Sequence, residues 1–209
     1  MNMIAIIDYD MGNVRSVEKA FEKVGAGAVI TRDPRVIDNA SHVVLPGVGA
    51  FRDCMKNLDE YGLIGPITRS IASGKPFLGI CLGLQLLFEE SAEFGRHRGL
   101  GALKGKVVRF PAGLEYEGER LKIPHMGWNE IKIKKDSALL EGVRDGSYFY
   151  FVHSYYAVPD EPGSALTTTG YGMEFTSAVS MDNVMACQFH PEKSQKAGLR
   201  VLKNFSMMA

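Results

Sequence analysis

Cys81 stands where an apolar, strand-like run gives way to a helix-like run, with a glycine two residues to either side of it. Small residues at Gly79 and Gly83 permit the cramped turn that presents a nucleophile in the G-x-S-x-G elbow of hydrolases. A helix N-terminus directly after Cys81 would favour the reactive thiolate. The segment predicts a cysteine nucleophile on a strand-to-helix elbow, with Gln85 one helical turn further on the same face. The alternative is a buried cysteine that acts only as a small hydrophobic residue.

A base and its orienting group stand near the end of the chain, in the segment Phe-His-Pro-Glu at residues 189–192. Proline disfavours the helical region for the residue before it, so His190 is expected to be extended and Glu192 to fall on the same side of the chain. An imidazole beside a carboxylate is a base with its orienting group. Together with Cys81 it forms the nucleophile, base and orienter of covalent catalysis.

A glycine-rich loop, Pro46-Gly47-Val48-Gly49, directly follows the apolar run 42–45. Alternating glycines let the backbone adopt unusual dihedral angles and approach a ligand closely, which suits amide donors for an oxyanion. A plain turn before the next helix is the alternative.

Units of strand, loop and helix must position these residues. Short apolar runs cover residues 3–7, 28–31, 42–45 and 76–81, and helical stripes cover residues 14–24, 52–58 and 63–73. Asn13 is expected to cap the first helix and Gly25 to end it. This alternation predicts an α/β fold with a doubly wound, mostly parallel sheet whose carboxyl edge carries the chemistry.

The rest of the chain predicts an additional antiparallel β portion. A strand is expected at 106–110, one aromatic strand at 148–156, a hairpin formed by 173–181 and 184–189, and a helix capped by Ser194. Trp128, the only tryptophan, is expected in a loop, either as a core plug or as an anchor for a partner. Since no linker composition divides the chain, we expect a single domain over residues 1–209.

Composition limits the classes of function. The 24 Lys and Arg residues balance the 24 Asp and Glu residues, which argues against a general affinity for nucleic acid or an anionic membrane. No apolar run is long enough to span a membrane, and the first residues are too short and uncharged a segment for a signal peptide, so we expect a cytoplasmic protein. The 3 cysteines lack C-x-x-C spacing, so neither a disulfide nor a metal site is expected, and no cofactor motif is present.

The elbow, the Pro-Gly-Val-Gly loop and the His-Pro-Glu ending resemble those of class I (triad) glutamine amidotransferases. More closely, segments along the whole chain are similar to the glutaminase subunits of imidazole glycerol phosphate synthases: residues 8–13, 46–51, 79–87, 124–129, 151–155 and 188–193. The chain departs from the common pattern at Asp10, where many relatives have glycine, and at Ser154, where threonine is common.

The resemblance implies a flavodoxin-like sheet and hydrolysis of L-glutamine through a Cys81 thioester. It also implies roles for further residues: the Leu82 amide and an amide of Gly47, Val48 or Gly49 would hold the oxyanion, and Gln85, Ser154 and Tyr155 would bind the amino acid end of the substrate. The ammonia would pass to a (βα)8-barrel cyclase subunit in a 1:1 heterodimer, which makes imidazole glycerol phosphate and AICAR in histidine biosynthesis.

We expect the partner interface to include Asn13, His125, Met126, Trp128 and Lys193, and we hold His125 and His153 as secondary site residues. Three alternatives remain open. The chain could serve another amidotransferase, such as that of pyridoxal phosphate synthesis. It could be a Cys-His-Glu hydrolase of another γ-glutamyl or peptide substrate. It could also be a flavodoxin-like binding module without catalysis.

Overall fold

The fold is organised around a mixed sheet of 8 strands, described here from a computed structural model that covers residues 3–209, with residue 162 described by its backbone alone. Its parallel part has the order β2-β1-β3-β4-β16, the flavodoxin-like order, and consists of β2 (Ala28–Thr31), β1 (Ile4–Ile7), β3 (His42–Gly47), β4 (Phe77–Cys81) and β16 (Val184–Cys187). The sheet continues antiparallel through β15 (Glu174–Met181), β14 (Ala165–Gly170) and β11 (Lys132–Ile133). The α/β fold expected from the sequence, with its additional antiparallel portion, is confirmed.

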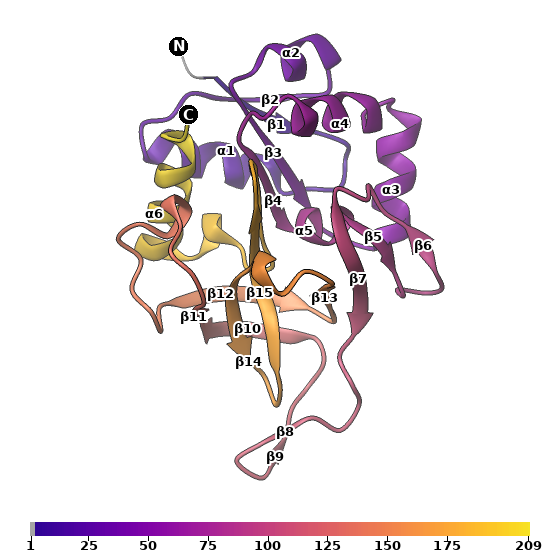
Figure 1. Ribbon diagram of the computed structural model, residues 1–209, viewed down its shortest axis with the longest axis vertical. Coiled ribbons are helices and arrows are strands. Elements are labelled where there is room, and N and C mark those ends of the chain that lie inside the picture. Colours follow the sequence, from indigo (N-terminus) through magenta and orange to yellow (C-terminus); the bar gives the residue numbers. More distant parts are fainter. Residues whose placement is uncertain (1–2) are drawn as a thin grey trace.

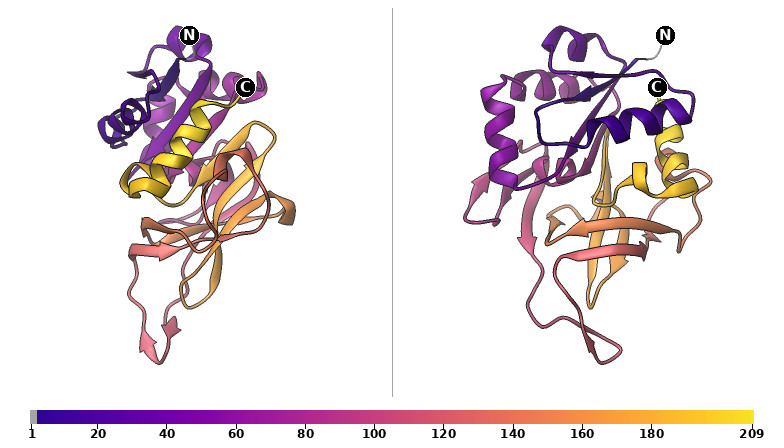
Figure 2. Two further views of the ribbon diagram at one scale, coloured as in Figure 1. Left: turned by 90° about the vertical axis from the view of Figure 1, so that its left-hand side faces the viewer. Right: turned by 180° about the vertical axis from the view of Figure 1, so that it is seen from behind.

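Helices cover both faces of the parallel strands because alternate strand residues point to opposite sides. Ile4 and Ile6 of β1 pack in one core with α1 (Val14–Lys23) and α6 (Gln195–Ser206). Ala5 and Ile7 pack in a second core with α2 (Pro34–Asn39), α3 (Phe51–Glu60) and α4 (Ile64–Ala72). The turned views in Figure 2 show this layering, with α1 and α6 in contact with each other. Each fully buried Leu, Ile or Phe contributes about 1.5–3 kcal/mol to such cores.

A second β region lies beside the main sheet (Figure 1). Its larger sheet has the order β13-β7-β5-β6 and consists of β13 (Tyr155–Pro159), β7 (Leu103–Arg109), β5 (Phe88–Ser91) and β6 (His97–Arg98). A separate antiparallel pair is formed by β10 (His125–Glu130) and β12 (Tyr148–His153). In Figure 1, β5, β6 and β7 lie to the right of β4, and β10 and β12 lie next to β14 and β15. The short hairpin of β8 (Glu115–Tyr116) and β9 (Glu119–Arg120) projects from the body, and the remaining short elements are α5 (Leu82–Leu86), η1 (Ala138–Leu140), η2 (Pro162–Ser164) and η3 (Pro191–Lys193).

The expected single aromatic strand at 148–156 is wrong, because the chain changes sheets at Ser154. Residues up to His153 pair with β10, whereas Tyr155 pairs with Arg109 of β7. The Ser154 carbonyl accepts the Phe110 amide at 3.1 Å, which joins the chain to its new neighbour. Aromatic and β-branched composition predicts extended backbone but does not say which strand it will pair with.

The expected loop around Trp128 is also wrong. Trp128 lies within β10, directly opposite Tyr150 of β12. Gly127, which reads as a strand breaker, adopts φ +133° and is accommodated within the ladder. Cross-strand pairing has overridden the local propensity of the residues around it.

Two expected helix caps are placed correctly but do not act through their side chains. Asn13 and Ser194 precede α1 and α6, yet neither side chain makes a capping hydrogen bond. The Ser194 hydroxyl instead donates to the His190 carbonyl at 2.6 Å and accepts the Tyr150 amide at 3.0 Å. Gly25 does follow the end of α1, at φ +81°.

Between residues 89 and 121 the sequence predicted only the strand of β7, and β5, β6 and the β8–β9 hairpin were missed.

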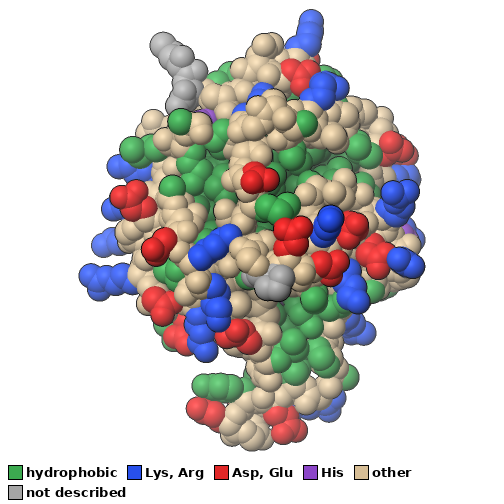
Figure 3. Space-filling view, viewed as in Figure 1, with side chains coloured by type: hydrophobic (Ala, Val, Ile, Leu, Met, Phe, Trp, Pro, Cys, Tyr) green, Lys and Arg blue, Asp and Glu red, His purple; other side chains and the backbone are tan. Residues whose placement is uncertain are grey.

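Acidic and basic side chains are interspersed on the face shown in Figure 3, and the β8–β9 hairpin stands clear of the body at the lower end. Within residues 3–209, no helix combines the length and the apolar character needed to cross a membrane.

Candidate active site

Cys81 is the last residue of β4 and immediately precedes α5, so it lies on a strand-to-helix elbow as the sequence predicts. Its backbone is strained, with φ +55° and ψ −109°. A Cβ on Gly83 would lie 1.8 Å from the Leu45 carbonyl oxygen, and one on Gly79 would lie 2.9 Å from the Gly83 carbonyl oxygen. Both glycines are therefore required by the close approach of backbone to backbone.

His190 and Glu192 are in direct contact. The His190 Nδ1 lies 2.8 Å from the Glu192 Oε1, with side chains that are 3% and 1% exposed. The pairing is as expected, but the stated reason for it is wrong, since Glu192 lies in the 3-10 turn η3 and not in extended chain. The His190 backbone is fixed by donation of its amide to the Tyr150 carbonyl at 2.9 Å. With Nδ1 donating to the carboxylate, Nε2 is the atom left for chemistry.

The charge state of His190 depends on its neighbours. Burial lowers the pKa of His190, but the adjacent Cys81 sulfur and the Glu192 carboxylate raise it more strongly, to about 10. Nε2 has no hydrogen-bond partner by geometry within the described residues, and Cys81 is the neighbour that raises this pKa most. His190 is therefore protonated at neutral pH, which is the form that can give a proton to a leaving group.

A cavity of about 310 Å³ opens beside Cys81. This is at the small end of the range of about 300–1,000 Å³ for ligand pockets, and it suits a molecule of amino acid size. Its walls come from both β regions: Val48, Gly49, Cys81, Leu82, Gln85, Glu93, Pro124, Val152, His153, Ser154, Tyr155 and His190. The structure thus brings the predicted nucleophile, base and substrate-binding residues to one cavity.

Gln85 is fixed by two hydrogen bonds. Its Nε2 donates to the Tyr155 carbonyl and to the Gln188 Oε1, each at 3.0 Å. Both amide protons are used, so Oε1 is the atom with which Gln85 can contact a ligand.

Sequence reasoning missed two residues beside the cavity. Glu93 is the one carboxylate that lines it within the described part of the chain, and its Oε2 accepts the Phe51 amide at 2.6 Å. No signal pointed to Glu93, which lies in a stretch without periodicity. Gln188, whose Nε2 lies 3.8 Å from the Cys81 Sγ, stands two residues before His190, and the alternation of extended chain was a signal that could have found it.

The glycine-rich loop adjoins the elbow, since Gly47 pairs with Cys81 across β3 and β4. Gly49 has φ +95°, a conformation that side chains rarely adopt. The Val48 amide donates to the Met11 carbonyl at 2.8 Å and is therefore not directed at the cavity. In this arrangement Val48 does not supply an oxyanion donor.

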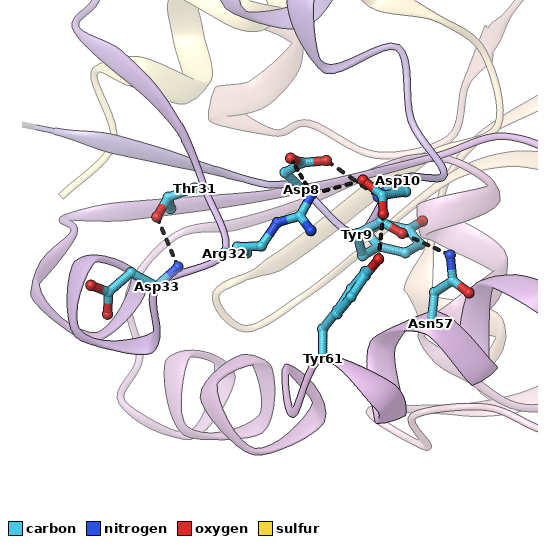
Figure 4. Close-up of polar contacts among 8 residues, drawn as sticks. All are labelled: Asp8, Tyr9, Asp10, Thr31, Arg32, Asp33, Asn57 and Tyr61. Carbon is cyan, nitrogen blue, oxygen red and sulfur yellow. Dashed lines mark hydrogen bonds and ion pairs between the residues drawn. The ribbon is translucent and has the colours of Figure 1, made fainter.

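The loop that carries Met11 is held by the polar cluster shown in Figure 4. Arg32 donates to Asp8 and to Asp10, each at 2.7 Å, and its guanidinium lies 4.7 Å from the centre of the Tyr61 ring. The Tyr61 hydroxyl donates to Asp10, whose backbone has φ +65°. These contacts hold the acceptor of the Val48 amide in place.

The residues expected at a partner interface are only partly exposed. Met126 and Trp128, on β10, are 64% and 45% exposed, and Asn13 and Lys193 are also exposed. His125 is 3% exposed, so it is not available as an interface residue. Its ring instead faces inward, between the β10–β12 pair and the residues around Phe175.

Comparison with known proteins identifies the family. The family model described as glutamine amidotransferase class-I matches residues 5–209. The chain belongs to the class I glutamine amidotransferase family. The relatives that the chain matches include proteins named imidazole glycerol phosphate synthase subunit HisH. The protein from Geobacter metallireducens is 57% identical over 207 residues, 99% of this chain and 99% of that protein. The protein from Aquifex aeolicus is 56% identical over 205 residues, 98% of this chain and 96% of that protein.

Solved structures agree with this glutamine amidotransferase fold. PurLQS from Thermotoga maritima superposes with a TM-score of 0.74 over 97% of this chain and 96% of that chain, at 17% identity. A structure described as a glutamine amidotransferase has a TM-score of 0.73 at 19% identity, over 98% of this chain and 99% of that chain. At these identities the likeness is one of fold, and the resemblance stated from the sequence is confirmed by the closer relatives.

Proposed function

We propose that this chain is the glutaminase subunit of an imidazole glycerol phosphate synthase and acts as a single domain over residues 1–209. The observation that carries the proposal is the cavity that brings Cys81 on its strained elbow together with the buried His190–Glu192 pair. The names of the relatives support the choice of this synthase among amidotransferases. Because a thioester mechanism requires a reduced thiol, we also propose a cytoplasmic location.

The chemistry is acyl transfer through sulfur. The Cys81 thiolate attacks the side-chain carboxamide carbon of glutamine, and the oxyanion that forms is held by the Leu82 amide and an amide of the Gly47–Gly49 loop. His190 gives its Nε2 proton to the departing nitrogen as the C–N bond breaks, and Glu192 stabilises the imidazolium through Nδ1. Water, deprotonated by His190, then attacks the thioester and releases glutamate and the Cys81 thiolate.

The cavity suits the amino acid end of glutamine. The Glu93 carboxylate fits an ammonium group, and the free Oε1 of Gln85 can accept a hydrogen bond from the same group. Ser154 and Tyr155 also line the cavity, and their backbone amides are the proposed donors to the α-carboxylate.

The ammonia requires a sealed route, because in water it would take up a proton and lose its nucleophilic lone pair. We propose that a (βα)8-barrel cyclase subunit receives it in a 1:1 heterodimer. The exposed Met126 and Trp128 of β10 are the proposed docking residues, with Asn13 and Lys193 as further contacts. The loop around Val48 is the proposed movable part, since its amide must leave the Met11 carbonyl before it can serve an oxyanion.

The test is labelling with an electrophile that mimics glutamine, followed by mass mapping. We expect the label on Cys81 alone, with loss of glutamine turnover. Cys54 and Cys187 are internal controls, since both are 0% exposed and burial raises the pKa of each thiol, that of Cys54 to about 12. Label spread evenly over the three cysteines would remove Cys81 from its role. Faster turnover of γ-glutamyl peptides or folate conjugates than of glutamine would favour the alternative hydrolase.

A further inference from the structure

Gln188 is a buried side chain to which the mechanism above gives no role. It lies between β16 and His190, and it is 0% exposed. Its Nε2 points at the Cys81 Sγ from 3.8 Å, within the range of a hydrogen bond to sulfur. Its backbone amide donates to the Ser177 carbonyl at 2.8 Å, so the residue is tied to β15.

The orientation of the Gln188 carboxamide is fixed by a backbone carbonyl. The Tyr155 oxygen can only accept hydrogen bonds, so the Gln85 atom that faces it at 3.0 Å must be the nitrogen. The same nitrogen faces Gln188 at 3.0 Å, which requires the Gln188 oxygen there. A reversed Gln188 would set two amide nitrogens against each other. The Gln188 nitrogen is therefore directed to the sulfur.

The Tyr155 carbonyl also determines which ring nitrogens of His153 and His125 carry a proton. It accepts the His153 Nδ1–H at 2.8 Å, which leaves His153 Nε2 without a proton to accept the His125 Nδ1–H at 2.9 Å. The Asn129 amide then donates to His125 Nε2 at 3.2 Å. Donors and acceptors thus match along the whole network from Asn129 to Cys81, which makes the Tyr155 carbonyl a rigid reference point for the active site.

We propose that Gln188 is the hydrogen-bond donor to the Cys81 sulfur and stabilises its thiolate, and that Gln85 positions Gln188 for this role. A hydrogen bond to an ionised acceptor is about twice as strong as one between neutral groups, so the contact favours the thiolate over the thiol. The inference rests on the proposed function only in taking Cys81 as the nucleophile.

Other titratable groups lie in the surroundings of Cys81 and are retained when Gln188 is changed. They come from several elements: His190 and Glu192 at η3, Tyr9 after β1, Cys54 in α3, Cys187 in β16, and Glu93 across the cavity. A change in Gln188 alone therefore isolates the contribution of the amide.

The experiment measures the rate of Cys81 alkylation by iodoacetamide as a function of pH in the full chain. Gln188→Met keeps the length of the side chain and removes the donor. We expect the apparent pKa of alkylation to rise by about one unit, which is about 1.4 kcal/mol, so that the rate at pH values well below the wild-type apparent pKa falls about tenfold. The plateau at high pH should be unchanged, since there the thiolate is fully formed without help. Gln195→Met, at an exposed glutamine, is the matched control and should follow the wild type.

Two results would overturn the proposal. One is an unchanged pH profile in a folded Gln188→Met protein. The other is a lower plateau without a shift in pKa, which would show a merely structural role. If Gln188→Met does not fold, Gln188→Glu serves instead, because it retains the acceptor for Gln85 and replaces the donor with a carboxylate. It should raise the apparent pKa further, and an unchanged profile in this variant also refutes the role.

Glutamine turnover measured on the same samples separates this proposal from the proposed function. Iodoacetamide needs no glutamine site, so a shifted alkylation profile in a protein that does not hydrolyse glutamine would retain the role of Gln188 and reject the glutaminase. Normal glutamine hydrolysis with an unshifted alkylation profile would retain the glutaminase and reject the role of Gln188.

Discussion

Acid should destabilise this protein through the paired histidines His125 and His153. Burial lowers the pKa of His125 to about 4. Burial is also the largest cause for His153, whose pKa is lowered to about 3, with the nearby His125 and His190 lowering it further. Both therefore stay neutral in the folded protein while the unfolded chain, with a histidine pKa of about 6.5, takes up protons. Stability from this pair is present above pH 6.5 and is lost as the pH falls toward 4 and 3.

The magnitude follows from linkage. Between pH 7 and pH 5, each histidine that stays neutral in the folded state lowers the free energy of unfolding by about 2 kcal/mol, or about 4 kcal/mol for the pair. His190 acts in the opposite direction. Its raised pKa, about 10, gives stability that is complete below pH 6.5 and lost as the pH rises through 10. Between pH 7 and pH 5, His190 therefore raises the free energy of unfolding by about 1 kcal/mol. The free energy of unfolding therefore falls by about 3 kcal/mol through these three histidines together, which is a large part of a typical stability of about 5–15 kcal/mol.

The assay is urea unfolding at pH 7 and at pH 5. The double variant His125→Gln and His153→Gln keeps hydrogen-bonding groups but removes the titration, so its stability should fall by about 4 kcal/mol less than that of the wild type. His97→Gln, on β6 and outside the network, is the control and should behave as the wild type. Burial also lowers the pKa of His42, but this residue is common to all the proteins compared. Equal losses in the wild type and the double variant would refute the reasoning.

Three further predictions concern the site. Gly83→Ala should lower the free energy of unfolding by at least about 3 kcal/mol, because the new Cβ would lie 1.8 Å from the Leu45 carbonyl oxygen. Gly170→Ala, where no atom lies within 4 Å, is its control in thermal unfolding, and equal stability of the two variants would contradict the elbow geometry. His190→Ala should remove nearly all glutamine turnover and Glu192→Ala less, since the imidazole keeps its chemistry without its orienting carboxylate. Greater damage from Glu192→Ala at unaltered stability would reverse these roles. The barrel partner with its ligand should raise glutamine turnover at least ~100-fold, which corresponds to about 2.7 kcal/mol, the worth of one oxyanion donor. Trp128→Ala should weaken that coupling while Cys81 still alkylates, whereas Met207→Ala, an exposed residue at the end of α6, should couple fully; turnover independent of the partner would rule out the switch.

The sequence by itself determined the features that depend on neighbours along the chain. The elbow could be predicted because only glycines allow the backbone around Cys81 to turn so tightly. The His190–Glu192 contact could be predicted because two residues of separation keep the side chains within reach, although the turn that achieves it differs from the one expected. The alternation of apolar strands and amphipathic helices determined the layered α/β fold.

Only the tertiary structure decided which distant groups meet. The Gln188–Cys81 contact spans 107 positions and the Gln85–Tyr155 contact 70, and no periodicity encodes separations of this kind. Glu93 reaches the cavity from a stretch without regular pattern for the same reason. The change of sheet at Ser154 depends on which strands offer free hydrogen-bonding edges, which local composition does not specify. The Val48 amide is held by Met11 because two loops from different strands end at the same edge of the sheet, and that meeting exists only once the strands have paired.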